Sequence, residues 1–172
     1  MINTAEFKAI HSEIVRADEL VQRYLSDLGV GRVDKLIEEY REEVSLLPRN
    51  ATLSNERVRY YIHHMGIEHY KLSTTLAKAN LQKDVSSAYL GAKVSEKLLD
   101  VRNRDGKFIR EEKEAIATSE TYNETIISKV FSDIQGAIVE RLNSVNKILY
   151  GLGTIATLNM ADMKQTGTGS SI

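Results

Sequence analysis

The sequence predicts an all-α protein: a long antiparallel helical hairpin with a small helical appendage at its N-terminus. Three observations favour this fold class. The 172 residues contain one proline, Pro48, whereas strands and their turns need more chain breakers. Glu, Lys, Leu and Ala, which favour helices, are abundant. Apolar residues recur every three or four positions along most of the chain, which is the spacing of one helix face.

The first 50 residues form the predicted appendage. A helix is expected over residues 5–28, because the apolar side chains there share one face, and Gly29 and Gly31 should end it. A shorter helix is expected over 33–47. It should end before Pro48, because the residue preceding a proline usually leaves the α region. A linker then leads to the hairpin.

The first arm of the hairpin is predicted as one long helix over residues 55–102, bearing two apolar stripes. One stripe is mostly small, so a partner helix is expected to approach closely there. Its members are Tyr70, Thr74, Ala77, Leu81, Ala88, Ala92, Ser95 and Leu99. The other stripe must be covered by the N-terminal helices or by another subunit. Its members are Leu72, Leu76, Leu90, Val94, Leu98 and Val101.

The second arm is expected from about residue 109 to about residue 160, after an Asp-Gly turn at 105–106. Its apolar residues follow the four-and-three alternation of a bundle or coiled-coil seam. Two short N-terminal helices should not cover such a seam, so the C-terminal helix is predicted to assemble a homo-oligomer. The residues predicted to mediate oligomerisation are Phe131, Ile134, Ile138, Val145, Leu149 and Leu152.

The predicted organisation therefore has three parts. Residues 1–50 are the appendage, residues 51–163 the hairpin, and residues 164–172 a tail. The tail is expected to be disordered, because it has no apolar surface to bury.

Charge is segregated along the chain, although the formal net charge is only -1. Residues 1–50 carry 7 Lys and Arg against 10 Asp and Glu, residues 51–113 carry 12 against 8, and residues 114–172 carry 4 against 6. At ~100° per residue, most of the basic residues of the first arm fall within less than half of its circumference, so a basic stripe follows it towards the turn. They are Arg57, Lys71, Lys78, Lys83, Lys93, Lys97 and Arg104. A solvated helix face is the commoner explanation of such a stripe, and binding of a polyanion is the alternative.

Cations collect at the turn itself, in the stretch LLDVRNRDGKFIREE at residues 98–112. Basic residues at a helix C-terminus complement the helix dipole, which accounts for Arg102 and Arg104. The dipole disfavours Lys107 and Arg110 at the start of the following helix. An anionic ligand at the turn would resolve this conflict.

Few residue patterns favour catalysis. The chain has no cysteine, which excludes thiol chemistry and thiolate metal sites, and it contains no P-loop, dinucleotide fingerprint or nucleophile signature. His64 and Glu68 are four residues apart, but no complete ligand set for a metal is apparent. We therefore expect a protein that is not an enzyme and has no cofactor and no metal.

The segment RVRYYIHHMGIEHYK, residues 57–71, mixes arginines with tyrosines. Such a mixture suits phosphate contacts combined with base stacking. Tyrosines in a helix interface with polar rims explain it equally well.

The chain is expected to act in the cytoplasm. It needs no oxidising compartment, and its N-terminus lacks the order of a secretory signal. Its longest apolar stretch, at 148–158, is shorter than the roughly 20 residues that span a bilayer.

From Tyr70 to about residue 163, the chain resembles the phage recombination mediators of the UvsY type. The resemblance is one of pattern and spacing. It rests on the lysine-bearing helix AKVSEKLLDVR, the polar turn RDGKF, the acidic stretch IREEKEAIATSETY and the apolar-periodic helix IISKVFSDIQGAIVERLNSVNKILYGLGTIATL.

The resemblance implies a non-enzymatic protein that binds single-stranded DNA and assembles into rings through its C-terminal helix. Such proteins help a RecA-like recombinase replace single-strand-binding protein in a phage-infected bacterium. Lys93 and Lys97 match by position the basic residues before the turn, where the family contacts DNA. The candidate nucleic-acid-binding residues are Lys83, Lys93, Lys97, Arg102, Arg104, Lys107 and Arg110. The alternative is a phage structural or assembly protein whose hairpin oligomerises without nucleic acid.

Overall fold

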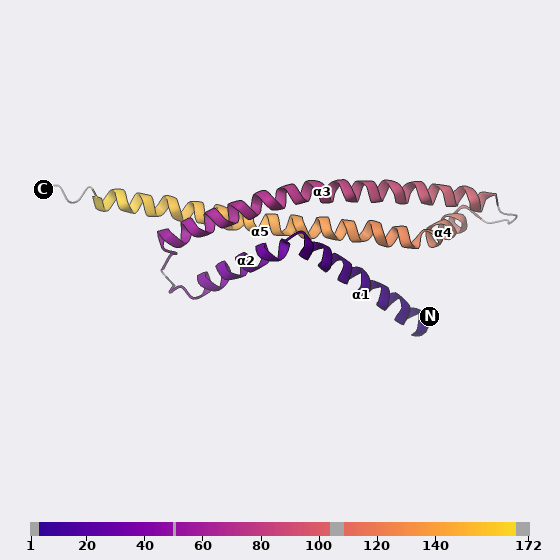
Figure 1. Ribbon diagram of the computed structural model, residues 1–172, viewed down its shortest axis with the longest axis horizontal. Helices are drawn as coiled ribbons and strands as arrows, with labels where there is room; N and C mark the ends of the chain where they lie inside the picture. Colours follow the sequence, from indigo (N-terminus) through magenta and orange to yellow (C-terminus); the bar gives the residue numbers. More distant parts are fainter. Residues whose placement is uncertain (1–3, 50, 104–108, 168–172) are drawn as a thin grey trace. The chain divides into compact units, whose positions relative to one another are not determined.

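The computed structural model describes the backbone of residues 4–49, 51–103 and 109–167, and the side chains of residues 15–49, 51–103 and 109–161. These residues form five helices, α1 (Thr4–Asp27), α2 (Val30–Ser45), α3 (Asn55–Arg102), α4 (Arg110–Glu120) and α5 (Tyr122–Gly167) (Figure 1). The helices α3 and α5 pack antiparallel, so the predicted all-α hairpin is confirmed. The predicted turn at 105–106 lies outside the described residues.

The second arm differs from its prediction, because it is divided at Thr121 into α4 and α5. Thr121 is buried, and its hydroxyl donates to the carbonyl oxygens of Ala117 and Thr118, each at 3.1 Å. The backbone of Thr121 leaves the helical region, with φ -108° and ψ 26°. Thr75 and Thr157 make the same bond to the preceding turn inside unbroken helices, so the bond alone does not end α4.

The break between the first two helices is also tighter than predicted. Gly29 adopts φ +73°, a left-handed conformation that costs glycine little. The helix α2 begins immediately after it, at Val30, so Gly31 lies within a helix rather than between two. At the other end of the chain, α5 runs to Gly167 and includes the start of the predicted tail.

The chain divides into two compact units, and α3 and α5 each contribute to both. The first unit contains residues 1–27 and 76–137. In it, the ring of Tyr24 on α1 packs edge-on against Phe131 on α5, with 6.3 Å between ring centroids. The Tyr24 hydroxyl donates to Oε1 of Gln82 on α3 at 2.6 Å. These contacts attach α1 to both arms of the hairpin.

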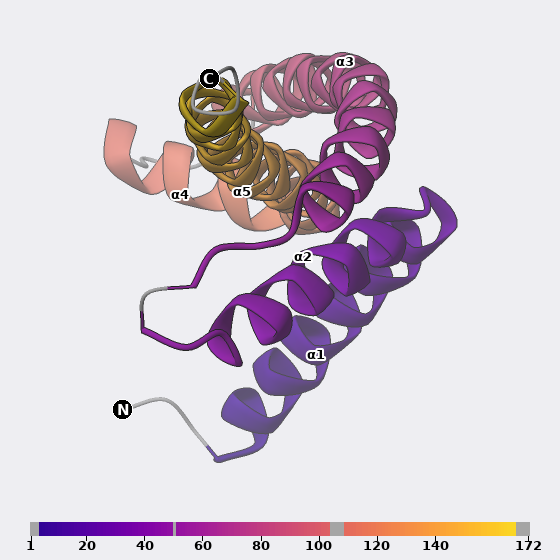
Figure 2. The same ribbon diagram turned by 90° about the vertical axis from the view of Figure 1, so that its left-hand side faces the viewer.

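The second unit contains residues 28–75 and 138–172. Figure 2 shows the start of α3 lying beside α2. Arg141 on α5 donates from Nε and Nη2 to the carboxylate of Asp34 on α2, at 2.9 to 3.1 Å. Asn159 on α5 donates to Oδ1 of Asn55 on α3 at 2.7 Å. All three helices are therefore joined by polar contacts around the apolar core of this unit.

The seam predicted on the C-terminal helix is covered within a single chain. Ile134, Ile138, Val145 and Leu152 are at most 1% exposed, and Phe131 and Leu149 are half-buried. The premise that a second subunit must cover these residues is therefore wrong. Assembly through α5 stays a prediction, but burial of the seam no longer requires it.

The two stripes of α3 have opposite environments. One stripe, from Leu72 to Val101, was expected to be covered by the N-terminal helices or by another subunit. In it, Leu72 and Val101 are buried and the other members are half-buried. In the stripe of mostly small residues, Ala77, Leu81, Ala88, Ala92, Ser95 and Leu99 are all exposed. The hairpin interface therefore uses the larger side chains and leaves the smaller ones on the outer surface of α3.

Candidate nucleic-acid interface

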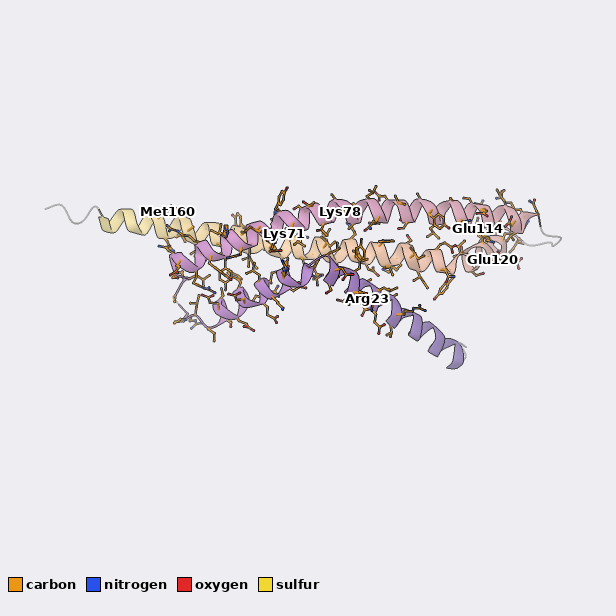
Figure 3. All side chains as sticks on the ribbon, in the orientation of Figure 1. Arg23, Lys71, Lys78, Glu114, Glu120 and Met160 are labelled. Atoms are coloured by element: carbon orange, nitrogen blue, oxygen red, sulfur yellow. The ribbon has the colours of Figure 1, made fainter. Side chains whose placement is uncertain are left out.

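The candidate interface is the part of α3 from residue 76 to Arg102, which lies wholly within the first unit. It is an uninterrupted helix, so its side chains project from a rigid rod at fixed spacing. Figure 3 shows Lys78 on this rod. The basic residues of this segment are Lys78, Lys83, Lys93, Lys97 and Arg102, and the acidic ones are Asp84, Glu96 and Asp100.

Two of the predicted binding lysines have carboxylate partners. The Nζ of Lys93 lies 2.7 Å from Oε2 of Glu96, and this hydrogen bond raises the pKa of Lys93 and lowers that of Glu96. The Nζ of Lys97 lies 3.9 Å from a carboxylate oxygen of Asp100 and 3.9 Å from one of Glu120. The two ion pairs of Lys97 are long. The ion pairs of Lys93 and Lys97 are also partly exposed, so water and salt screen them.

Three other cations on this segment are less engaged. Lys78 and Arg102 are exposed and Lys83 is half-buried. Within the described parts of the chain, none of the three has an ion-pair partner. They can therefore meet a phosphate without first losing an internal contact.

The cations predicted at the turn give less support to a nucleic-acid interface. Arg104 and Lys107 lie outside the described residues. Arg110, at the start of α4, donates from Nε to Oε1 of Glu114 at 2.9 Å, and this bond raises its pKa. The carboxylate of Glu112 also accepts a hydrogen bond from the Ile109 backbone N–H at 3.0 Å. These acidic residues compensate Arg110 at the helix N-terminus, so an external anion is not needed to explain it.

An aromatic residue outside the predicted site, Tyr89, lies beside one of the lysines. The ring of Tyr89 is 53% exposed, and the Nζ of Lys93 lies 5.9 Å from its centroid. This distance is within the range of a cation–π contact. The signal in the sequence is the spacing of four residues on one helix, which places the two side chains on the same face. The pair offers a surface for base stacking next to a phosphate-binding charge.

The segment at 57–71 has a structural role at Arg57 and Tyr61. Tyr61 is fully buried, and its hydroxyl donates to the carboxylate of Glu43 on α2 at 2.7 Å. Arg57 donates from Nε to both oxygens of Glu43 at 2.8 Å and from Nη2 to Glu39 at 3.0 Å. Of the two explanations open from the sequence, an interface of tyrosines with polar rims is the correct one for these residues.

This network also perturbs ionisation. Hydrogen bonds from Arg57 and then from Tyr61 lower the pKa of Glu43. Burial, followed by the hydrogen bond to Glu43, raises the pKa of Tyr61. The hydrogen bonds behind both shifts join α2 to α3 within the second unit.

Other kinds of site find little support in the described residues. Those residues contain no group of three or more metal-ligating side chains placed to hold an ion. A groove of about 840 Å³ lies between α1 and the start of α5, but its charged lining residues are mostly acidic, namely Asp18, Glu19, Lys129 and Asp133. No helix in the described ranges is long and apolar enough to cross a membrane.

Comparison of the chain with models of protein families, with curated proteins and with solved structures gives no significant match.

Proposed function

We propose that this chain is a non-enzymatic accessory protein that binds single-stranded nucleic acid along α3. The observation that carries the proposal is the exposed Tyr89 ring beside Lys93, on a helix that also presents Lys78, Lys83 and Arg102 without described ion-pair partners. Unpaired bases stack on exposed aromatic rings, while nearby cations neutralise the phosphates. A duplex hides its base faces, so single strands should bind more tightly than duplexes of the same length.

The resemblance to UvsY-type mediators extends this proposal to a biological role. The protein would act in the cytoplasm of a phage-infected bacterium, as an oligomer that helps a RecA-like recombinase displace single-strand-binding protein. The order of a basic arm, a polar turn and a long apolar arm supports this role, and the hairpin of α3 and α5 is compatible with it.

A second candidate is an assembly protein that does not bind nucleic acid. The exposed apolar stripe on α3 favours it, because an assembly protein needs such a surface. The internal partners of Lys93, Lys97 and Arg110 also favour it, since they lower the number of unengaged cations.

Reversing three charges on α3 separates the two candidates. If Lys78, Lys83, Lys93 and Arg102 contact four phosphates, the slope of log K against log salt for oligo-dT should be about -3, at about -0.7 per contact. Changing Lys83, Lys93 and Arg102 together to Glu should leave a slope of about -1 or abolish binding. Fluorescence anisotropy with a labelled oligo-dT at several salt concentrations measures both values.

The matched control is reversal of Lys35, Arg49 and Lys147, which are exposed and lie off this segment of α3. Reversing them should change the slope of log K against log salt only a little. Equal losses from the two triple variants would mean that total charge alone governs binding. Failure of the unmodified protein to bind oligo-dT at low salt would favour the assembly protein.

A further inference from the structure

The outer face of α3 carries an apolar stripe between Ala77 and Leu99 that no described part of the chain covers. Leu81, Val85 and Leu99 are 65%, 60% and 58% exposed. At ~100° per residue, the stripe occupies a sector of about 80° over six turns, and no Lys, Arg, Asp or Glu falls within it. The residues in the sector are Ala77, Leu81, Val85, Ala88, Ala92, Ser95 and Leu99. A continuous uncharged face of this length, with exposed apolar side chains, is typical of an interaction site.

We infer that this stripe pairs with the same stripe of a second copy of the chain, in antiparallel orientation, about a two-fold axis near Ala88. The order of side-chain sizes supports that register. Antiparallel pairing centred on Ala88 sets Leu81 opposite Ser95 of the second copy and Leu99 opposite Ala77, with Ala88 opposite Ala88 and Val85 between the levels of Ala88 and Ala92. Both leucines then face a small residue and the axis itself has only alanine, so two helices can approach to about 8 Å. Parallel pairing would set Leu81 against Leu81 and Leu99 against Leu99.

The charges that border the stripe are complementary in the same register. In an antiparallel pair, equivalent flanks of the two helices meet. Lys78 of one copy then lies between the heights of Glu96 and Asp100 of the second copy, all on one flank of the stripe. Lys78 is exposed and has no ion-pair partner in the described ranges, whereas the side chains of Glu96 and Asp100 are 56% and 55% exposed. The two-fold axis repeats these contacts, so each pair of chains gains two sets.

The pairing would also change the proposed nucleic-acid surface, because it engages Lys78 with carboxylates but brings two stacking positions together. This consequence rests on the proposed function. Tyr89 lies on the same flank as Lys78, close to the level of the axis. The Tyr89 rings of the two copies would then be neighbours, each with its own Lys93. One strand could stack on both rings.

Sedimentation equilibrium of the full chain without nucleic acid tests the pairing directly. The unmodified protein should reach at least twice the mass of one chain as its concentration rises. Changing Leu81 and Leu99 together to Gln should raise the dissociation constant of this step about a hundredfold, because two apolar contacts are lost from each copy. The substituted side chains are exposed, so the helical circular dichroism signal should not change. The control is Tyr150→Gln, which alters an exposed apolar residue on α5.

Cross-linking tests the orientation, because the chain has no cysteine of its own. A mixture of Leu81→Cys and Ser95→Cys proteins, oxidised with oxidised glutathione, should form mainly the mixed disulfide. Predominance of disulfides between like variants would overturn the antiparallel register.

A single-chain mass at all concentrations, or self-association unaffected by Leu81→Gln with Leu99→Gln, would overturn the pairing itself. A chain that pairs but does not bind oligo-dT would retain this inference and lose the proposed function.

Discussion

Replacement of Ile138 by Asp should destabilise the protein by about 4 kcal/mol or more, which is enough to unfold many domains. Ile138 is fully buried on α5 in the second unit. A carboxylate there would lose its hydration, and the space left by the side chain would add a cavity. Urea denaturation followed by circular dichroism measures the effect.

Leu158→Asp is the matched control, because Leu158 lies on the same helix but is exposed. It should change the free energy of unfolding by about 0.5 kcal/mol or less. If α5 acted chiefly as an assembly surface, Ile138→Asp would instead give a folded protein of lower oligomeric mass. That result would contradict the assignment of the seam to the interior of the chain.

Removing the side chain of Tyr61 should have the next largest effect. Tyr61→Ala should cost about 3–5 kcal/mol, because it empties a fully buried position between α2 and α3. Tyr61→Phe retains the ring and removes the hydroxyl that donates to Glu43 and accepts from Arg57. It should cost about 1.5–3 kcal/mol, the range for hydrogen bonds to charged groups. Chemical denaturation of the two variants separates the contribution of packing from that of the hydroxyl.

The same network predicts a dependence of stability on pH. The pKa of Glu43 is lower in the folded protein than its ordinary value of 4.5. Its ionised form therefore stabilises the fold above pH 4.5, and this contribution is lost as the pH falls through the lowered pKa. Glu43→Gln should be less stable than the unmodified protein at neutral pH, and the difference should shrink in acid. A difference that stays constant down to pH 3 would contradict this assignment.

The helices themselves could be predicted from the sequence, because their periodicity and breakers are local signals. The break at Thr121 could not, since threonines such as Thr75 and Thr157 make the same bond to the preceding turn inside unbroken helices. The periodicity of α5 predicts an apolar seam, but it does not reveal whether the covering helix belongs to the same chain or to another. Ile138 and Val145 are covered by the chain itself.

The candidate site could be predicted only in part, because the sequence shows which face of a helix a residue lies on but not which side chains it contacts. A helical wheel places Lys93 and Lys97 on the basic flank of α3, but it does not show which carboxylates reach them. The partner of Lys97 on α4, Glu120, lies 23 residues further along the chain. Which apolar stripe of α3 faces outward was likewise decided by packing against α5, and this exposure leads to the inferred self-pairing.

Fluorescence of a Tyr89→Trp variant gives the most direct test of binding along α3. The chain has no tryptophan, so a single indole at this position reports on contacts at the proposed interface. Titration with oligo-dT at low salt should quench its emission to saturation as a base stacks on the ring, and added salt should restore it. The same substitution at Tyr150, exposed on α5, should give no quenching. An emission from the Tyr89→Trp protein that oligo-dT leaves unchanged, or equal quenching at both positions, would contradict the account.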